Sequence, residues 1–111
     1  MYRVRIEHSL LKCLCELVYL QELGLSYNDL SGSLPWCFAN LTYLQVLDIS
    51  FNQFSGNISS SSLKALTFIQ ELRLSDNHFQ IPISLEPFFN HSKLKSFYSD
   101  NNEIYTDSHI L

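Results

Sequence analysis

The stretch LQVLDISFNQFSGNI, Leu44 to Ile58, decides the fold of this chain, because the rest of the sequence repeats it. In the stretch, spaced apolar residues lead to an asparagine, and a phenylalanine and a glycine follow. The same skeleton recurs before and after it, with asparagines at Asn28, Asn52, Asn77 and Asn102, so the steps are 24, 25 and 25 residues. Self-similarity at a fixed period in this range indicates a stacked array of coils.

The spacing LxxLxLxxN is the pattern of leucine-rich repeats. We therefore predict a right-handed α/β solenoid in which every coil supplies one short parallel strand and returns through a short helical segment at the back. The predicted strands are Glu22–Ser26, Val46–Ser50, Glu71–Ser75 and Ser96–Asp100.

The repeat divides the chain into a partial leading repeat and four further repeats, with no recognisable cap at either end. The boundaries are 1–16, 17–40, 41–65, 66–90 and 91–111. The first three full repeats are regular. The last is degenerate, because His91 stands where other coils have leucine and Ser99 takes an inward apolar position.

Two sets of residues should hold the coils together. The turn asparagines Asn28, Asn52, Asn77 and Asn102 should form a ladder, because an amide side chain can both donate to and accept from buried backbone groups. Shifting by the repeat step also predicts a buried column on the back and places Leu17 at the core position of Leu41. The column consists of Leu14, Phe38, Leu63 and Phe88.

Composition restricts the function. With 46% hydrophobic and 16% charged residues the chain should pack rather than remain disordered. The net charge of -4 and the lack of a basic cluster argue against nucleic-acid binding. The sequence shows neither a secretory signal nor an uninterrupted apolar span of about 18 residues.

The three cysteines allow at most one internal disulfide. Either Cys13 or Cys15 could pair with Cys37, and one repeat step back from Cys37 leads to Cys13. No second pair of ligands stands at zinc-like spacing, so we expect neither a metal site nor a cofactor.

Two stretches go beyond the generic repeat. LSGSLP (Leu30–Pro35) and FSGNIS (Phe54–Ser59) resemble the LxGxIP signature of plant-specific extracellular leucine-rich repeats, found in receptor-like kinases, receptor-like proteins and polygalacturonase-inhibiting proteins. Nearly the whole chain looks most similar to an internal segment of a receptor-like protein ectodomain.

This resemblance implies a non-catalytic module at the extracellular side of the plant plasma membrane. Such a module would bind a peptide or protein ligand, and a co-receptor kinase, in defence or developmental signalling. Two alternatives stay open. One is a secreted enzyme inhibitor similar to polygalacturonase-inhibiting proteins, and the other is a truncated gene product without independent activity.

Three N-glycosylation sequons are present, at Asn40, Asn57 and Asn90. Asn40 and Asn90 take the same place in their coils, on the predicted back of the solenoid, and Asn57 lies on the flank. All three could therefore carry glycans without covering the strands.

The residues that alternate with the inward leucines should form an exposed ligand-binding face. The serines near the strand ends, Ser26, Ser50 and Ser75, follow the repeat and are better explained by the turn. The better candidates for ligand contact break the repeat and are Glu22, Asp48, Glu71, Arg73 and Tyr98. The predicted face consists of Glu22, Gly24, Tyr27, Val46, Asp48, Phe51, Glu71, Arg73, Asp76, Ser96, Tyr98 and Asp100.

An enzymatic function is not indicated. The histidines His8, His78, His91 and His109 lack metal-ligand spacing, and neither a phosphate loop nor a nucleophile elbow is present. We therefore expect a binding protein.

Overall fold

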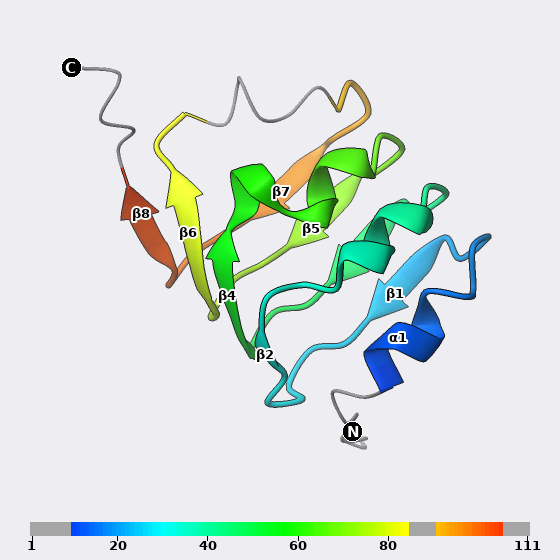
Figure 1. The fold of residues 1–111 in the computed structure, drawn as a ribbon. Helices are drawn as coiled ribbons and strands as arrows, with labels where there is room; N and C mark the ends of the chain where they lie inside the picture. Colours follow the sequence, from blue (N-terminus) through cyan, green and yellow to red (C-terminus); the bar gives the residue numbers. More distant parts are fainter. Residues whose placement is uncertain (1–9, 85–90, 106–111) are drawn as a thin grey trace.

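The computed structural model describes residues 10–84 and 91–105, which form coils stacked one on the next in sequence order (Figure 1). One parallel sheet has the order β1-β3-β5-β7. Its strands are β1 (Glu22–Gly24), β3 (Val46–Asp48), β5 (Glu71–Arg73) and β7 (Ser96–Tyr98). The predicted leucine-rich repeat solenoid with parallel strands is confirmed.

The strands of this first sheet begin at the predicted residues but end two residues earlier than predicted. Their register pairs Glu22 with Val46, Val46 with Glu71 and Glu71 with Ser96, which are the repeat steps themselves. Inter-coil hydrogen bonds continue past the strand ends, as from Leu25 N to the Asp48 carbonyl at 2.7 Å. The chain then turns at residues of positive φ, which ends the extended conformation.

A second parallel sheet, of order β2-β4-β6-β8, covers the flank, and the sequence analysis did not predict it. Its strands are β2 (Ser31–Gly32), β4 (Gln53–Asn57), β6 (His78–Pro82) and β8 (Glu103–Tyr105). Partners in this sheet, such as Ser31 with Gln53 and Ser55 with His78, are 22 or 23 residues apart, two fewer than the repeat step. Because side chains alternate with a period of two, this stagger keeps the same side chains inward.

The back of the coils is formed by short 3₁₀ turns, η1 (Trp36–Asn40), η2 (Ile58–Ser60) and η3 (Ser62–Ala65). Phe38 and Leu63 are buried there, and Leu14 is partly buried. The fourth member of the predicted column, Phe88, lies outside the described residues. The hydrophobic core lies between the back and the first sheet, where Leu44, Leu47 and Ile49 are all fully buried.

The leading segment departs from the repeat. It forms a five-residue α-helix, α1 (Leu10–Leu14), instead of a 3₁₀ turn, so the 24-residue step does not extend into it. The prediction that Leu17 occupies a core position was wrong, because this side chain is 51% exposed while Leu11 is fully buried.

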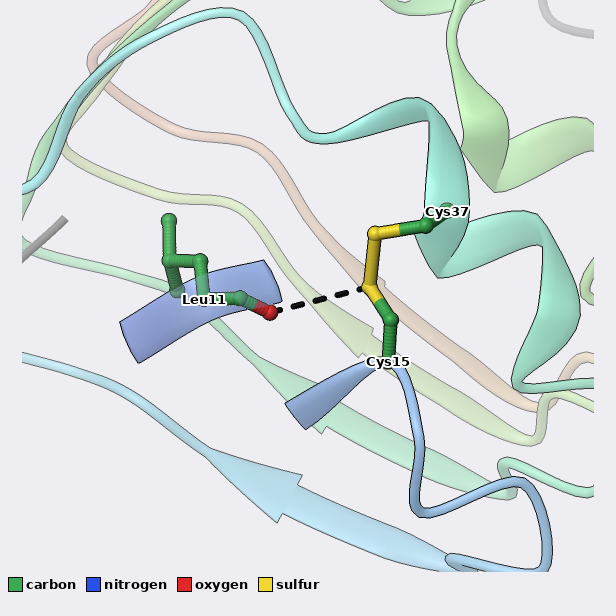
Figure 2. The surroundings of a disulfide bond; sticks show 3 residues. All are labelled: Leu11, Cys15 and Cys37. Carbon is green, nitrogen blue, oxygen red and sulfur yellow. Dashed lines mark hydrogen bonds between the residues drawn. A yellow bond between two sulfur atoms is a disulfide. The ribbon is translucent and has the colours of Figure 1, made fainter. Parts of the chain in front are cut away.

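A disulfide joins this segment to the next coil (Figure 2). Of the two open pairings, the structure contains Cys15–Cys37, with 5.7 Å between the Cα atoms, while Cys13 is exposed with a free thiol. The Cys15 sulfur lies 3.6 Å from the Leu11 carbonyl oxygen. An oxidised sulfur carries no proton, so we interpret this approach as a packing contact.

Across residues 10–84 and 91–105, no helix has the length and apolar character needed to cross a membrane.

Candidate functional site

The turn asparagines fix the edge of the first sheet. Asn52 Oδ1 accepts hydrogen bonds from the backbone N–H groups of Asn28 and Leu30, both at 3.0 Å. Its Nδ2 donates to the carbonyls of Leu25 (2.9 Å), Ile49 (3.1 Å) and Ser50 (3.1 Å).

The other asparagines repeat this arrangement one coil further along. Asn77 accepts from Phe54 N at 3.0 Å, and Asn102 accepts from Phe79 N at 2.9 Å. Asn28, Asn52 and Asn77 are buried, and Asn102 is half-buried. Because the amides of Asn52, Asn77 and Asn102 each bind backbone groups of their own coil and of the preceding one, the turns after the strands are held in a fixed register.

The outward side of β1, β3, β5 and β7, together with residues of the turns that follow these strands, forms a surface that we call the strand face. Its members are the residues predicted to bind a ligand, and every one of them is exposed or half-buried. The face carries Glu22, Asp48, Glu71, Asp76 and Asp100 against a single cation, Arg73, a net charge of -4. This face is therefore strongly acidic for its size.

Arg73 is fixed at the centre of the strand face. Its Nε donates to Glu71 Oε2 at 2.9 Å, and its guanidinium carbon lies 4.7 Å from the centroid of the Tyr98 ring. The hydrogen bond and the charge of Glu71 raise the pKa of Arg73, so this group stays cationic.

The carboxylate of Asp48, on the neighbouring strand, is also oriented. It accepts hydrogen bonds from Ser50 N at 3.1 Å and from Ser50 Oγ at 2.6 Å. Ser50 is buried and takes part in the turn. The central charged groups of the face are thus held by local hydrogen bonds rather than free in solvent.

A pair of stacked aromatic rings borders the strand face where the strands end. The centroids of Tyr27 and Phe51 lie 4.3 Å apart with 8° between the ring planes, and the side chains are 40% and 44% exposed. Both residues have left-handed backbones, with φ of 61° and 55°.

Asp76 and Asn101 take the same left-handed conformation at the equivalent positions of the later coils, with φ of 59° each. Asn and Asp tolerate this conformation, whereas bulky residues are strained in it by about 1 to 3 kcal/mol. The aromatic residues at Tyr27 and Phe51 therefore lower stability relative to the residue types used in the other coils.

A second aromatic row borders the opposite edge of the face, and the sequence analysis did not identify it. Tyr19, Tyr43 and Phe68 precede the strands, with centroid distances of 5.4 Å and 6.4 Å, and Lys93 Nζ lies 5.4 Å from the Phe68 ring. The steps of 24, 25 and 25 residues between these four positions follow the repeat and could have revealed the row. Exposed aromatic residues thus stand on both sides of an acidic strip.

The sequons lie away from the strand face. Asn40 is exposed at the end of η1. Asn57 is half-buried at the end of β4, and its Oδ1 accepts from Ser59 N at 2.9 Å, which caps η2. Asn90 lies outside the described residues, and glycosylation at all three remains a prediction.

Of the four histidines, the structure describes His78 and His91. In the part of the chain that the structure describes, no three His, Cys, Asp or Glu side chains are grouped so as to hold a metal ion. His78 is exposed on β6. His91 is buried at the core position that Leu41 and Leu66 fill in the other coils, and burial lowers its pKa against the opposing effect of backbone hydrogen bonds at Lys64 and Leu63.

Comparison with known proteins identifies the repeat. The Leucine Rich Repeat family model matches residues 19–41 and 43–65. Cuscuta receptor 1 of Solanum lycopersicum is 40% identical over 95 residues, a match that covers 85% of this chain and 8% of that protein.

Solved plant structures show the same fold. The leucine-rich repeat ectodomain of the Arabidopsis receptor kinase HAESA, solved in complex with an IDA peptide hormone, is 33% identical over 82% of this chain and 15% of that one, with a TM-score of 0.71. The BIR3–SERK2 complex of Arabidopsis thaliana provides a chain that is 33% identical over 90% of this chain and 50% of that one, with a TM-score of 0.69. The chain is therefore a leucine-rich repeat protein, similar in sequence and fold to the ectodomains of plant receptors.

Proposed function

We propose that this chain is a non-catalytic binding module of the extracellular side of a plant cell-surface receptor, and that its strand face binds a basic peptide or a basic segment of a protein. The proposal is supported most by one observation. Tyr27 and Phe51 keep a strained backbone conformation in order to present a stacked, exposed aromatic pair beside an acidic strip. Strain retained without a gain in stability points to a role in binding.

The chemistry of the face supports a basic partner. Its net charge of -4 favours lysine and arginine side chains in the ligand, and charge complementarity mainly raises association rate and specificity. Exposed aromatic residues such as Tyr98, which is 41% exposed, supply apolar area at low cost in side-chain entropy. An extended peptide running along the sheet would meet both kinds of group.

The solved relative HAESA, in complex with a peptide hormone, gives this proposal a precedent in a protein of the same fold. The chain spans 8% of the tomato receptor that it matches, so a partner kinase and a signalling role are proposals for the whole receptor rather than for this chain alone. A secreted inhibitor of a basic enzyme would use the same face, and a soluble complex of the chain with such an enzyme would favour that function instead.

The experiment is a selection of random 12-residue peptides, displayed on phage, on the immobilised oxidised chain. We expect the enriched peptides to contain Lys or Arg together with aromatic or aliphatic residues, and their binding to weaken as salt increases. The charge-reversed variant Asp48→Lys, immobilised in the same way, should not retain the enriched peptides. Enrichment of acidic peptides, or equal retention by the variant, would contradict the proposal.

A further inference from the structure

A groove of about 260 Å³ lies on the flank of the solenoid, on the side of the second sheet and apart from the strand face. It is formed where β2 and β4 lead into the 3₁₀ turns of the back. The lining residues are Ser33, Leu34, Trp36, Ser55, Gly56, Asn57, Ser60, Ser61, Ser62 and Phe79.

The groove is neutral and rich in hydroxyl groups. None of its lining residues is charged, five are serines, and the apolar part includes the indole of Trp36, which is 79% exposed. An open aromatic face beside neutral hydroxyl groups fits a sugar ring, whose C–H groups pack on the indole while its hydroxyl groups exchange hydrogen bonds with the serines. It does not fit a phosphate or a carboxylate, because no cation is present.

The asparagine of a glycosylation sequon lies in the wall of the groove. Asn57 lines the groove and begins the sequence Asn57-Ile58-Ser59. Its Oδ1 is held by Ser59, from N at 2.9 Å and from Oγ at 2.6 Å. The orientation of the amide is thus set by the sequon serine itself, and Nδ2 is the atom that would carry the sugar.

We propose that Asn57 is N-glycosylated and that the first N-acetylglucosamine of this glycan sits in the groove against Trp36. This inference rests on the proposed extracellular location. In the transfer, Nδ2 forms a bond to C1 of the sugar and loses one proton to a base of the transferase, while the bond from C1 to the diphosphate oxygen of a lipid-linked oligosaccharide donor breaks. The released lipid diphosphate takes the bonding electrons.

The seated sugar has two consequences. It covers an exposed indole and fills a groove, so the glycan should stabilise the flank rather than only decorate it. It also directs the glycan away from the strand face, which remains open to a ligand.

The test uses the intrinsic fluorescence of Trp36, because this is the only tryptophan in the chain. The full chain is secreted from plant cells behind an added signal peptide as an Asn40→Gln/Asn90→Gln variant, so that Asn57 is the only sequon. The glycan is then trimmed to one N-acetylglucosamine. The same variant made in bacteria with its disulfide formed is the sugar-free control. We expect the sugar to lower acrylamide quenching of Trp36 about two-fold and to shift its emission to the blue, since the ring would cover much of the indole.

A stability cycle provides the second readout. The glycan should raise the melting temperature of the chain with Trp36, and Trp36→Ala should remove most of that increase. Adding free N-acetylglucosamine at millimolar concentration to the sugar-free chain should reproduce neither effect, which distinguishes the attached sugar from a soluble one.

The possible failures are separable. If the unmutated secreted chain carries a glycan at Asn40 but not at Asn57, or if glycosylation of Asn57 leaves the quenching of Trp36 unchanged, this inference is wrong and the proposed function stands. If none of the three sequons is modified in the secretory pathway, this inference is wrong as well, whereas the proposed function is contradicted only by the outcome of the peptide selection.

Discussion

Replacing Asn52 by alanine tests how the coils are joined. The change removes the Oδ1 atom that accepts from the backbone amides of Asn28 and Leu30, in a turn where Asn52 is 7% exposed. Loss of the Nδ2 donor costs less free energy at the three carbonyls, because each of them keeps another hydrogen-bond donor. These donors are Asn28 Nδ2 for the Leu25 carbonyl, Asn77 Nδ2 for the Ile49 carbonyl and Tyr27 N for the Ser50 carbonyl.

The cost therefore comes from two amides rather than from five hydrogen bonds. A buried backbone donor without its acceptor costs about 1 to 3 kcal/mol, so we expect Asn52→Ala to lower the free energy of unfolding by about 2 to 6 kcal/mol. The assay is urea unfolding of the oxidised chain, followed by circular dichroism. The matched control is Asn40→Ala, which removes the same group from an exposed position and should change stability by less than about 0.5 kcal/mol. Equal urea midpoints for the two variants would refute the ladder as a source of stability.

Three other substitutions test the hydrophobic core, the Cys15–Cys37 disulfide and the degenerate last repeat. Leu47→Ala, at a fully buried position, should cost about 2 to 5 kcal/mol in the same urea assay, and a loss below about 1 kcal/mol would show that the site is not tightly packed. Cys15→Ser opens the loop closed with Cys37, 22 residues away, and should cost about 3 kcal/mol, whereas Cys13→Ser should be nearly neutral; similar losses for both would contradict the pairing. Burial lowers the pKa of His91 below its ordinary 6.5, so the unfolded chain binds the proton more readily. The contribution of neutral His91 to the free energy of unfolding is complete above about pH 6.5 and is lost as the pH falls further. His91→Leu should therefore flatten the pH dependence of the melting temperature between about pH 7 and 5, and an unchanged dependence would argue against this assignment.

The repeat period predicted the first sheet and the positions of the asparagines, because both depend on residues that recur at each step. The second sheet was not predictable in the same way. Its shortest strand, Ser31–Gly32, has two residues, and its partners are staggered by two residues from the repeat. Neither property leaves a periodic signal.

The leading segment was misplaced for a different reason. A shift by the repeat step assumes that each coil has the same back, but here α1 replaces a 3₁₀ turn and changes the number of residues per unit length. Leu17 consequently faces solvent, and the cysteine in contact with Cys37 is Cys15.

The alternation of the strands identified which residues face outward, but not what they do to one another. The stacking of Tyr27 on Phe51 and of Arg73 on Tyr98 depends on the distance between coils and on side-chain rotamers, which one sequence does not give. The left-handed backbone at Tyr27 and Phe51 was likewise hidden, since a sequence suggests positive φ mainly at glycine, asparagine and aspartate.

The strained aromatic residues at the edge of the acidic face should be present for binding. The most direct measurement compares the wild-type chain with a Tyr27→Asn/Phe51→Asn variant in two assays, thermal unfolding and the dissociation constant for a peptide selected on the wild type. Because asparagine tolerates the left-handed backbone, we predict that the variant melts at the same or a higher temperature and binds the peptide at least about ten-fold more weakly. Trp36→Ala, an exposed aromatic residue on the flank, should leave the dissociation constant unchanged. A variant that melts lower and binds as tightly as the wild type would contradict the claim.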